Sequence, residues 1–257
     1  MKPKIPCLRL QQSYMWQNKP VSLVLATYRE KNSIRAAIED FLATGLIDEV
    51  IVVNNNAEPG TDEEVKKTPA KLLYETRQGY GYTYQTGMTA ATGDYVIVAE
   101  PDGTFRGSDV ERFLVYAKDF PVVFGTRTNQ SSILNGAAMG LTRKLADVFV
   151  AKTIEVLYAT NSLTDVGCTY KLFNKSAIDQ IKGKWREGSP LFATELMLLT
   201  ITERIPFIEI PITFGERVGE STLTARFRDL AKWGVKIQWY VIQYWFRWKL
   251  RNKEITK

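Results

Sequence analysis

The sequence predicts an α/β domain built on a mostly parallel sheet, and three observations lead to this prediction. Short apolar runs of strand length alternate with helical patterns at about thirty residues per unit, as in βαβ folds. The first run, Val21–Ala26, is apolar except for Ser22, as expected of a parallel strand that helices cover on both faces. The chain of 257 residues has the length of one large α/β domain or of one domain with an appendage.

The first elements follow in order along the chain. Residues 1–20 contain several prolines, which predict an irregular arm. One short strand within this arm is compatible with its sequence. Residues Ile34–Ala43 place apolar side chains at helical spacing, and Gly45 ends that helix. Before residue 94 the other predicted elements are strands at Val50–Val53 and Lys71–Tyr74 and helices at Asp62–Lys67 and Tyr82–Ala91.

The same alternation continues downstream. The predicted strands are Tyr95–Ala99, Pro121–Phe124, a strand within Thr164–Asn174, and Pro206–Phe214. The predicted helices are Asp109–Lys118, Leu141–Tyr158 and Pro190–Thr202. Asn129–Gly140 is rich in Ser, Asn and Gly and predicts a mobile loop, and Gly215–Leu223 predicts a polar loop.

The last stretch, Arg226–Leu250, predicts an amphipathic helix. Its apolar side carries Phe227, Leu230, Ile237, Val241, Tyr244 and Trp248, and its opposite side Arg228, Lys232, Lys236, Gln243 and Arg247. Trp239 and Leu250 interrupt the polar side. A basic, aromatic helix is typical of a membrane interface, and the alternatives are packing on the domain or on a second copy of the chain. The expected division is therefore an arm (1–20), a globular domain (21–224) and this helix (225–257).

The composition excludes several kinds of site. The chain has no histidine, which rules out histidine ligands, Ser-His-Asp or Cys-His catalysis and a histidine base. Two cysteines far apart in sequence favour a reducing compartment over a disulfide scaffold. The formal charge of +6 is compatible with nucleic acid, an anionic membrane surface or a phosphorylated substrate. We expect neither a signal peptide nor a transmembrane helix.

Two carboxylates follow one of the predicted strands, in the stretch Asp94–Phe105. Glu100 and Asp102 come directly after Tyr95–Ala99, and ligands of open α/β sheets gather at the carboxyl ends of the strands. Carboxylate oxygens suit Mg²⁺ or Mn²⁺, which share such ligands with substrate phosphates. The pattern predicts a metal–diphosphate site, with an ordinary acidic turn as the structural alternative.

Seven short motifs occur one after another between Val21 and Leu223, and their order along the chain matters as much as their residues. They are Thr-Tyr-Arg-Glu after the first strand, VVNNN, RQGYGYTYQTG, EPD, GTR, TDVGCTYKLF and a late Arg-x-Gly-x-Ser-x-Leu. Together they resemble family 2 glycosyltransferases with the GT-A fold, and among these the polyprenyl- and dolichyl-phosphate glycosyltransferases, which include dolichol-phosphate mannose synthases. The resemblance implies the GT-A fold over residues 21–224 and a metal-dependent sugar transfer.

The resemblance also implies roles for particular residues. The nucleotide would bind at Thr27, Tyr28, Glu30, Asn55, Gln78, Gly81 and Glu100. Mg²⁺ or Mn²⁺ would bind at Glu100 and Asp102, and phosphates at Arg127, Arg143, Arg217 and Ser221. Three positions depart from the family pattern, because Asn55 and Glu100 stand where aspartate is common and Thr104 where a further glutamine ligand is common.

The expected chemistry follows from the charges involved. The leaving diphosphate needs charge stabilisation, which a metal at Glu100 and Asp102 and a nearby Arg127 would supply. A hydroxyl acceptor also needs a general base, for which Asp165 and Glu195 are the candidates. A phosphate acceptor needs none, because it is already an anion.

The first hypothesis is an inverting transferase that moves a sugar from a UDP- or GDP-sugar to a polyprenyl phosphate. It would be a peripheral protein on the cytoplasmic, inner face of the cell membrane. The alternative acceptor is a hydroxyl of a growing polysaccharide or lipopolysaccharide. A non-catalytic basic binding protein and a sugar-1-phosphate nucleotidyltransferase are further alternatives. Lysines and arginines are spread along the chain rather than clustered, so no nucleic-acid partner is expected.

Overall fold

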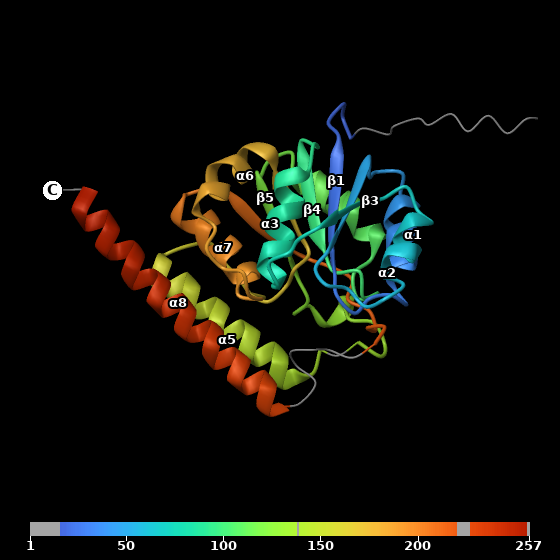
Figure 1. Cartoon of the computed structure of the whole chain (residues 1–257). Helices are drawn as coiled ribbons and strands as arrows, with labels where there is room; N and C mark the ends of the chain where they lie inside the picture. Colours follow the sequence, from blue (N-terminus) through green and yellow to red (C-terminus); the bar gives the residue numbers. More distant parts are fainter. Residues whose placement is uncertain (1–15, 138, 220–226, 256–257) are drawn as a thin grey trace, which may run out of the picture.

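A twisted sheet with helices on both faces forms the centre of the molecule (Figure 1). The computed structural model describes residues 16–137, 139–219 and 227–255, without the side chains of 227–230 and 252–255. The strands are β1 (Val21–Thr27), β2 (Glu49–Asn54), β3 (Lys71–Tyr74), β4 (Tyr95–Ala99), β5 (Val122–Thr126), β6 (Lys171–Asn174) and β7 (Phe207–Pro211). Their order in the sheet is β3-β2-β1-β4-β6-β5-β7. Only β6 runs antiparallel to its neighbours among these strands, so the predicted mostly parallel sheet is confirmed.

The helices agree closely with the sequence-based prediction. They are α1 (Ile34–Leu42), α2 (Thr61–Lys66), α3 (Tyr80–Ala90), α4 (Val110–Tyr116), α5 (Leu141–Tyr158), α6 (Lys175–Ile181), α7 (Phe192–Thr202) and α8 (Phe227–Ile255). Short 3₁₀ turns cover Gly107–Asp109, Gln130–Ser132 and Lys182–Lys184. Helix α3 begins two residues earlier than expected, and α6 was not predicted. Of the predicted arm, only residues from Trp16 onward are described, and Trp16 pairs with Lys19.

Two hydrophobic cores lie on the two faces of the sheet. Alternate strand residues point to opposite faces, so Leu23 and Leu25 of β1 enter one core and Val24 enters the other. The first core lies under α1 and α4, and the second under α3, α5, α6, α7 and α8. Strand β1 pairs with β2 on one side and β4 on the other. This divergence of neighbouring strands leaves a crevice at their carboxyl ends, where α/β sheets bind ligands.

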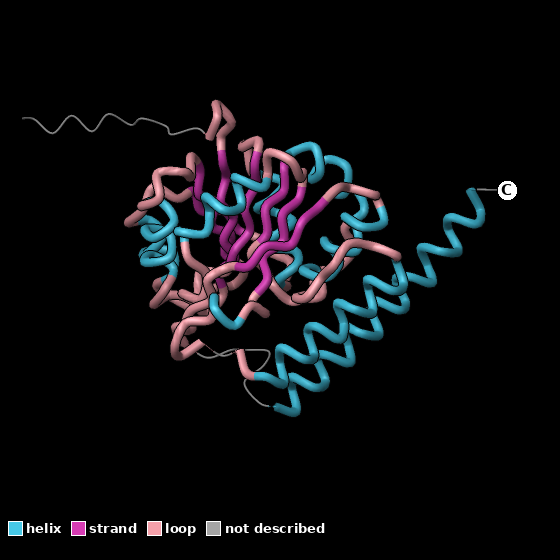
Figure 2. Tube along the Cα trace, turned by 180° about the vertical axis from the view of Figure 1, so that it is seen from behind, coloured by secondary structure: helices cyan, strands magenta, loops and turns pink. Residues whose placement is uncertain are grey.

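Helices α5 and α8 lie side by side and cover one flank of the domain (Figures 1 and 2). The Tyr158 hydroxyl donates to the Val241 carbonyl (3.2 Å), and Trp245 Nε1 donates to the Leu157 carbonyl (2.6 Å). Ile237 and Val241 are buried in the second core. The apolar side expected to face a membrane therefore packs on the domain, because α5 and α7 offer it an apolar surface. No helix in the described ranges has the length and apolarity to cross a bilayer.

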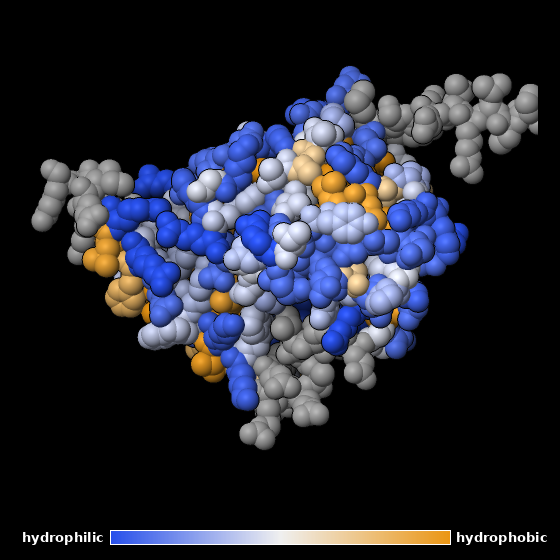
Figure 3. All heavy atoms as spheres, in the orientation of Figure 1, coloured by the Kyte–Doolittle hydropathy of each residue, from blue (hydrophilic) through white to orange (hydrophobic). Residues whose placement is uncertain are grey.

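A second apolar surface remains exposed on the same two helices. The exposed large apolar residues are Leu141, Leu145, Phe149 and Val156 on α5 and Val235, Trp239, Phe246 and Leu250 on α8. Their spacing places each set on one side of its helix, away from the core. Exposed basic residues of α8 flank them, namely Lys232, Lys236, Arg247 and Lys249. We call this area the α5–α8 outer surface. Figure 3 shows apolar groups among hydrophilic ones along α8.

Candidate active site

A cleft of about 710 Å³ opens at the carboxyl ends of β1, β2 and β4. One end is lined by Thr27, Tyr28, Glu30, Asn55 and Gln78, and the middle by Glu100, Asp102, Thr104 and Arg217. The far end is lined by Arg127, Arg143, Asp147, Trp233 and Ile237. The fold thus gathers most of the predicted site residues from distant parts of the chain into one cleft.

Glu30 organises the turn that follows β1. Its Oε2 accepts hydrogen bonds from the backbone N–H groups of Tyr28 (2.6 Å) and Arg29 (2.8 Å). The turn therefore holds Thr27, Tyr28 and Glu30 at the end of the cleft assigned to the nucleotide by resemblance. Their contacts with a nucleotide stay a prediction.

Asn55 lines the cleft and also holds the segment before α3 through its side chain. Its Nδ2 donates to the carbonyls of Glu75 (2.8 Å) and Arg77 (2.9 Å). Its Oδ1 accepts from Gln78 Nε2 (3.1 Å) and from the Gly79 N–H (2.8 Å). An aspartate would offer no donor to the two carbonyls, so these contacts require the amide of an asparagine.

Replacing Asn55 by aspartate is expected to lower the free energy of unfolding by about 2–4 kcal/mol. The change leaves two carbonyls without a donor and puts a charge in a side chain that is only 4% exposed. Urea unfolding monitored by tryptophan fluorescence measures this. The exposed Asn129, whose side chain accepts from Ser131 N–H, is the control, because aspartate also accepts there. Equal effects at the two positions would contradict the role given to Asn55.

Gly81 packs the start of α3 against the segment before α7 and is not among the residues that line the cleft. Its N–H donates to the Gly188 carbonyl (2.8 Å), and a Cβ at this position would lie 2.2 Å from the Glu187 carbonyl oxygen. Its expected place in the nucleotide-binding set stays a prediction. Gln78 and Tyr80, on either side of the α3 start, do line the cleft.

Threonine hydroxyls hold the two carboxylates that follow β4. The Thr104 hydroxyl donates to Asp102 Oδ1 (2.6 Å), and the Thr169 hydroxyl donates to Glu100 Oε1 (2.7 Å). Tyr80 contacts this Thr169 hydroxyl as well. Partial burial, followed by the proximity of Asp102, raises the pKa of Glu100 above its usual value. Thr104, at the position of a common glutamine ligand, orients the Asp102 carboxylate instead.

Arg217 places its guanidinium on this acidic pair. Its Nη1 lies 2.6 Å from Asp102 Oδ2 and 3.6 Å from Glu100 Oε2, and its Nη2 lies 3.6 Å from Glu30 Oε1. The backbone fixes this position, because the Val218 N–H donates to the Asp102 carbonyl (2.8 Å). The resemblance assigned Arg217 to a phosphate, and the structure places it beside the proposed metal ligands.

The same spot fits a divalent cation. Asp102 Oδ2 is buried and accepts no hydrogen bond of good geometry, so it has a lone pair available. Glu100 and Asp102 supply hard oxygen atoms, as Mg²⁺ and Mn²⁺ prefer. Within the described ranges no group of three or more His, Cys, Asp or Glu could hold a metal by itself. Further ligands would then come from a bound diphosphate and from water.

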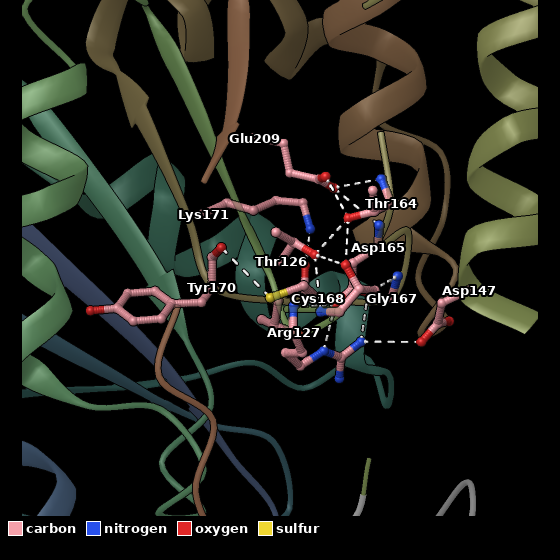
Figure 4. A network of polar contacts seen from close by, with 12 residues as sticks. Thr126, Arg127, Asp147, Thr164, Asp165, Gly167, Cys168, Tyr170, Lys171 and Glu209 are labelled. Carbon is pink, nitrogen blue, oxygen red and sulfur yellow. Dashed lines mark hydrogen bonds and ion pairs between the residues drawn. The ribbon is translucent and has the colours of Figure 1, made fainter. Parts of the chain in front are cut away.

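Arg127, at the far end of the cleft, forms a buried ion pair with Asp165 (Figure 4). Arg127 Nε and Nη2 each donate to one oxygen of Asp165 at 2.8 Å, and the Arg127 N–H also donates to Oδ2 (2.9 Å). Burial would raise the pKa of Asp165, but its contacts with Arg127 outweigh burial and lower it. Asp165 does not line the cleft. Its geometry is that of a residue that positions Arg127 rather than of a general base.

Glu195, the other base candidate, is also engaged in the protein. Its carboxylate accepts from the backbone N–H groups of Arg186 (3.1 Å) and Glu187 (3.0 Å) and from the Tyr240 hydroxyl (3.3 Å). Because Tyr240 belongs to α8, Glu195 ties α7 to the segment before it and to α8. Neither base candidate therefore has the free, cleft-facing oxygen that a general base needs.

Comparison with known proteins identifies the family. The pattern described as Glycosyl transferase family 2 matches residues 22–182, more than half of the chain. The chain belongs to this family. It is accordingly a glycosyltransferase, and the predicted enzyme class is confirmed.

Several named proteins are similar to this glycosyltransferase. Dolichyl-phosphate beta-glucosyltransferase of Saccharomyces cerevisiae is 24% identical over 80% of this chain and 70% of its own length. Dolichyl-phosphate hexose transferase of Haloferax volcanii is 24% identical over 79% of this chain and 86% of its own length. The low-salt glycan biosynthesis hexosyltransferase Agl6 of the same organism is also 24% identical, and the chain spans about half of its length.

Solved structures support the fold of the glycosyltransferase. Glucosyl-3-phosphoglycerate synthase from Mycobacterium tuberculosis, crystallised with Mn²⁺, UDP and phosphoglyceric acid, superimposes with a TM-score of 0.69. The match covers 89% of this chain and 79% of that chain at 13% identity. At this identity the likeness concerns the fold, and it confirms the expected GT-A architecture.

Two cleft residues of the glycosyltransferase are not singled out by sequence reasoning. Thr169 lies within the TDVGCTYKLF motif, and its hydroxyl donates to Glu100. Asp147 lies one helical turn after Arg143 on α5, and that spacing is the signal that could have found it. Ser221, expected to bind phosphate, lies outside the described residues.

Proposed function

We propose that this glycosyltransferase moves a sugar from a UDP- or GDP-sugar to a polyprenyl phosphate. It would work with inversion, as a peripheral protein on the cytoplasmic, inner face of the cell membrane. Two of the similar proteins are named for dolichyl phosphate, which supports a lipid-phosphate acceptor. The donor would occupy the end of the cleft at Thr27 and Asn55, and the acceptor phosphate the end at Arg143.

One observation carries the proposal: α5 and α8 take part in both the cleft and the α5–α8 outer surface. Arg143 of α5 and Trp233 of α8 line the cleft, while Phe149 and Trp239 of the same helices are exposed. A lipid phosphate has a charged head and an apolar tail. An enzyme resting on the outer surface would have the far end of its cleft beside the headgroup layer, where such a head lies.

The residues support a single displacement step. An oxygen of the acceptor phosphate attacks C1 of the sugar while the bond from C1 to the diphosphate breaks, and the nucleoside diphosphate leaves. The acceptor is already an anion, so the engaged carboxylates of Asp165 and Glu195 are not needed as bases. Arg143 would hold the acceptor phosphate through charge-assisted hydrogen bonds. A divalent ion held by Glu100 and Asp102 would stabilise the charge that develops on the leaving diphosphate.

A donor and acceptor screen tests the proposed function. Purified protein is incubated with Mg²⁺ or Mn²⁺ and a panel of UDP- and GDP-sugars, with and without a short polyprenyl phosphate. We expect metal-dependent transfer of one sugar to the lipid. Donor hydrolysis without transfer to lipid, together with transfer to a glycan hydroxyl, would instead support the alternative acceptor.

The variant with both Trp239→Asp and Phe149→Asp is expected to bind anionic vesicles at least about tenfold more weakly. Burying one large apolar side chain contributes about 1.5–3 kcal/mol, and tenfold in affinity corresponds to about 1.4 kcal/mol. Binding is measured by co-sedimentation with vesicles of phosphatidylglycerol and phosphatidylcholine. Raised salt should weaken the wild-type binding as well, since it screens Lys232 and Lys236 from the headgroups.

Val115→Asp is the matched control for vesicle binding. Val115 is an exposed apolar residue of α4, on the opposite face of the sheet from α5 and α8. Its replacement should leave vesicle binding unchanged. Wild-type binding by the double variant, or an equal loss in the control, would contradict the assignment of the α5–α8 outer surface to the membrane.

A further inference from the structure

Asp147 is a cleft carboxyl that the proposed displacement does not yet use. It comes from α5, one turn after Arg143, and lines the far end of the cleft. Its side chain is 16% exposed, and its Oδ2 lies 3.8 Å from Arg127 Nη2 (Figure 4). That oxygen is buried and has no hydrogen-bond partner among the described residues. A buried polar atom without a hydrogen bond destabilises the folded protein unless a bound ligand supplies that hydrogen bond.

The charged groups around Asp147 act on its protonation state in opposite directions. The charged groups that face it are Arg127 from the end of β5, Arg143 from its own helix and Asp165 from the segment before β6. Arg127 Nε and Nη2 already donate hydrogen bonds to Asp165. Burial and then the charge of Asp165 raise the pKa of Asp147 to about 7, although both arginines lower it. Near neutral pH, Asp147 therefore exists both as a carboxylate and as a carboxylic acid.

We propose that Asp147 determines acceptor specificity by donating a hydrogen bond, as a carboxylic acid, from Oδ2 to the acceptor phosphate. This inference rests on the proposed function. An ionised Asp147 would repel the phosphate dianion in a region of low dielectric, so the arriving phosphate favours the protonated form. Arg143 and the Asp147 acid then hold the phosphate from two successive turns of α5.

The proton on Asp147 stays in place during the transfer. The attacking phosphate oxygen forms the bond to C1, the bond to the diphosphate breaks, and the product is a phosphodiester with one negative charge fewer. Asp147 consequently holds its proton less firmly beside the product than beside the acceptor. The same carboxyl therefore favours binding of the phosphate monoester over the glycosylated diester.

The dependence of the acceptor KM on pH tests this inference, with wild type, Asp147→Asn and Asp147→Ser assayed between pH 6 and 9. For the wild type we expect the acceptor KM to rise up to about tenfold per pH unit above neutrality, because the acid form is lost there. Asparagine and serine remain donors at every pH, so both variants should keep a low acceptor KM over the whole range. The donor KM should be unchanged in all three proteins.

The outcomes separate this inference from the proposed function. Variants that keep the wild-type rise in acceptor KM would overturn the role of Asp147 and leave the reaction intact. Inactive variants that still bind donor and remain folded would also overturn it, since they would make Asp147 a general base for a hydroxyl acceptor. A wild type that transfers no sugar to lipid phosphate at any pH would overturn the proposed function itself.

Discussion

Replacing Asp102 by alanine is expected to lower kcat by about a thousandfold or more. Asp102 lies at the carboxyl end of β4, and its Oδ2 is the buried oxygen best placed to hold a cation against the diphosphate. Losing charge stabilisation at the leaving group costs about 3–4 kcal/mol or more in the barrier. The measurement is sugar transfer under saturating donor, with Mg²⁺ or Mn²⁺ varied.

The fold should survive this change. Asp102 contacts Thr104 and Arg217 at the edge of the sheet rather than in either core. We therefore expect a thermal midpoint within a few degrees of wild type. Asp179→Ala, at an exposed ion pair with Lys182, is the control and should keep full activity. An Asp102→Ala enzyme that remains active without added metal would place the chemistry elsewhere.

Replacing Asp165 by alanine is expected to lower the free energy of unfolding by about 3–5 kcal/mol. It would leave the buried guanidinium of Arg127 without its carboxylate, and an uncompensated buried charge is strongly destabilising. Urea unfolding at neutral pH measures the effect. The same Asp179→Ala variant should lower the free energy of unfolding by at most about 1 kcal/mol, because the ion pair that it removes is exposed.

The stabilisation that Asp165 provides should depend on pH, and the direction of its pKa shift determines how. The pKa of Asp165 is lowered in the folded protein, so its contribution is present above the unfolded pKa of about 3.9. That contribution is lost as pH falls through the folded pKa. The difference between wild type and Asp165→Ala should thus narrow below about pH 4. A constant difference down to pH 2 would mean that lost packing, not lost charge, destabilises the variant.

The regular elements could be predicted because their signals are local. The strand Tyr95–Ala99 and the helix Leu141–Tyr158 occur where the patterns placed them. Helix α6 was missed because it follows β6 without a loop. Its signal is Asn174, whose Oδ1 accepts from the Ala177 N–H (2.8 Å) and caps the helix.

The site could be predicted only where its residues are sequence neighbours. Glu100 and Asp102 share one strand end, so the pattern displays them together. The partners of Asp165 and Glu195 come from other elements, and no local pattern shows that their oxygens are already engaged. The periodicity of α8 likewise reveals an apolar side but not what covers it. Trp239 and Leu250, which appeared to spoil the polar side, belong to the exposed apolar surface.

The position of Arg217 gives the acidic centre an internal counterion. Glu30, Glu100 and Asp102 all lie within ion-pair distance of its guanidinium, so their mutual repulsion is offset before any substrate arrives. A divalent ion at these carboxylates would exchange with this built-in cation, and a diphosphate would favour the exchange by attracting Arg217 to itself. Thermodynamic reciprocity then requires that the donor tighten ion binding by the same factor as the ion tightens donor binding. Each alone would bind weakly, and the enzyme would hold them best as a pair.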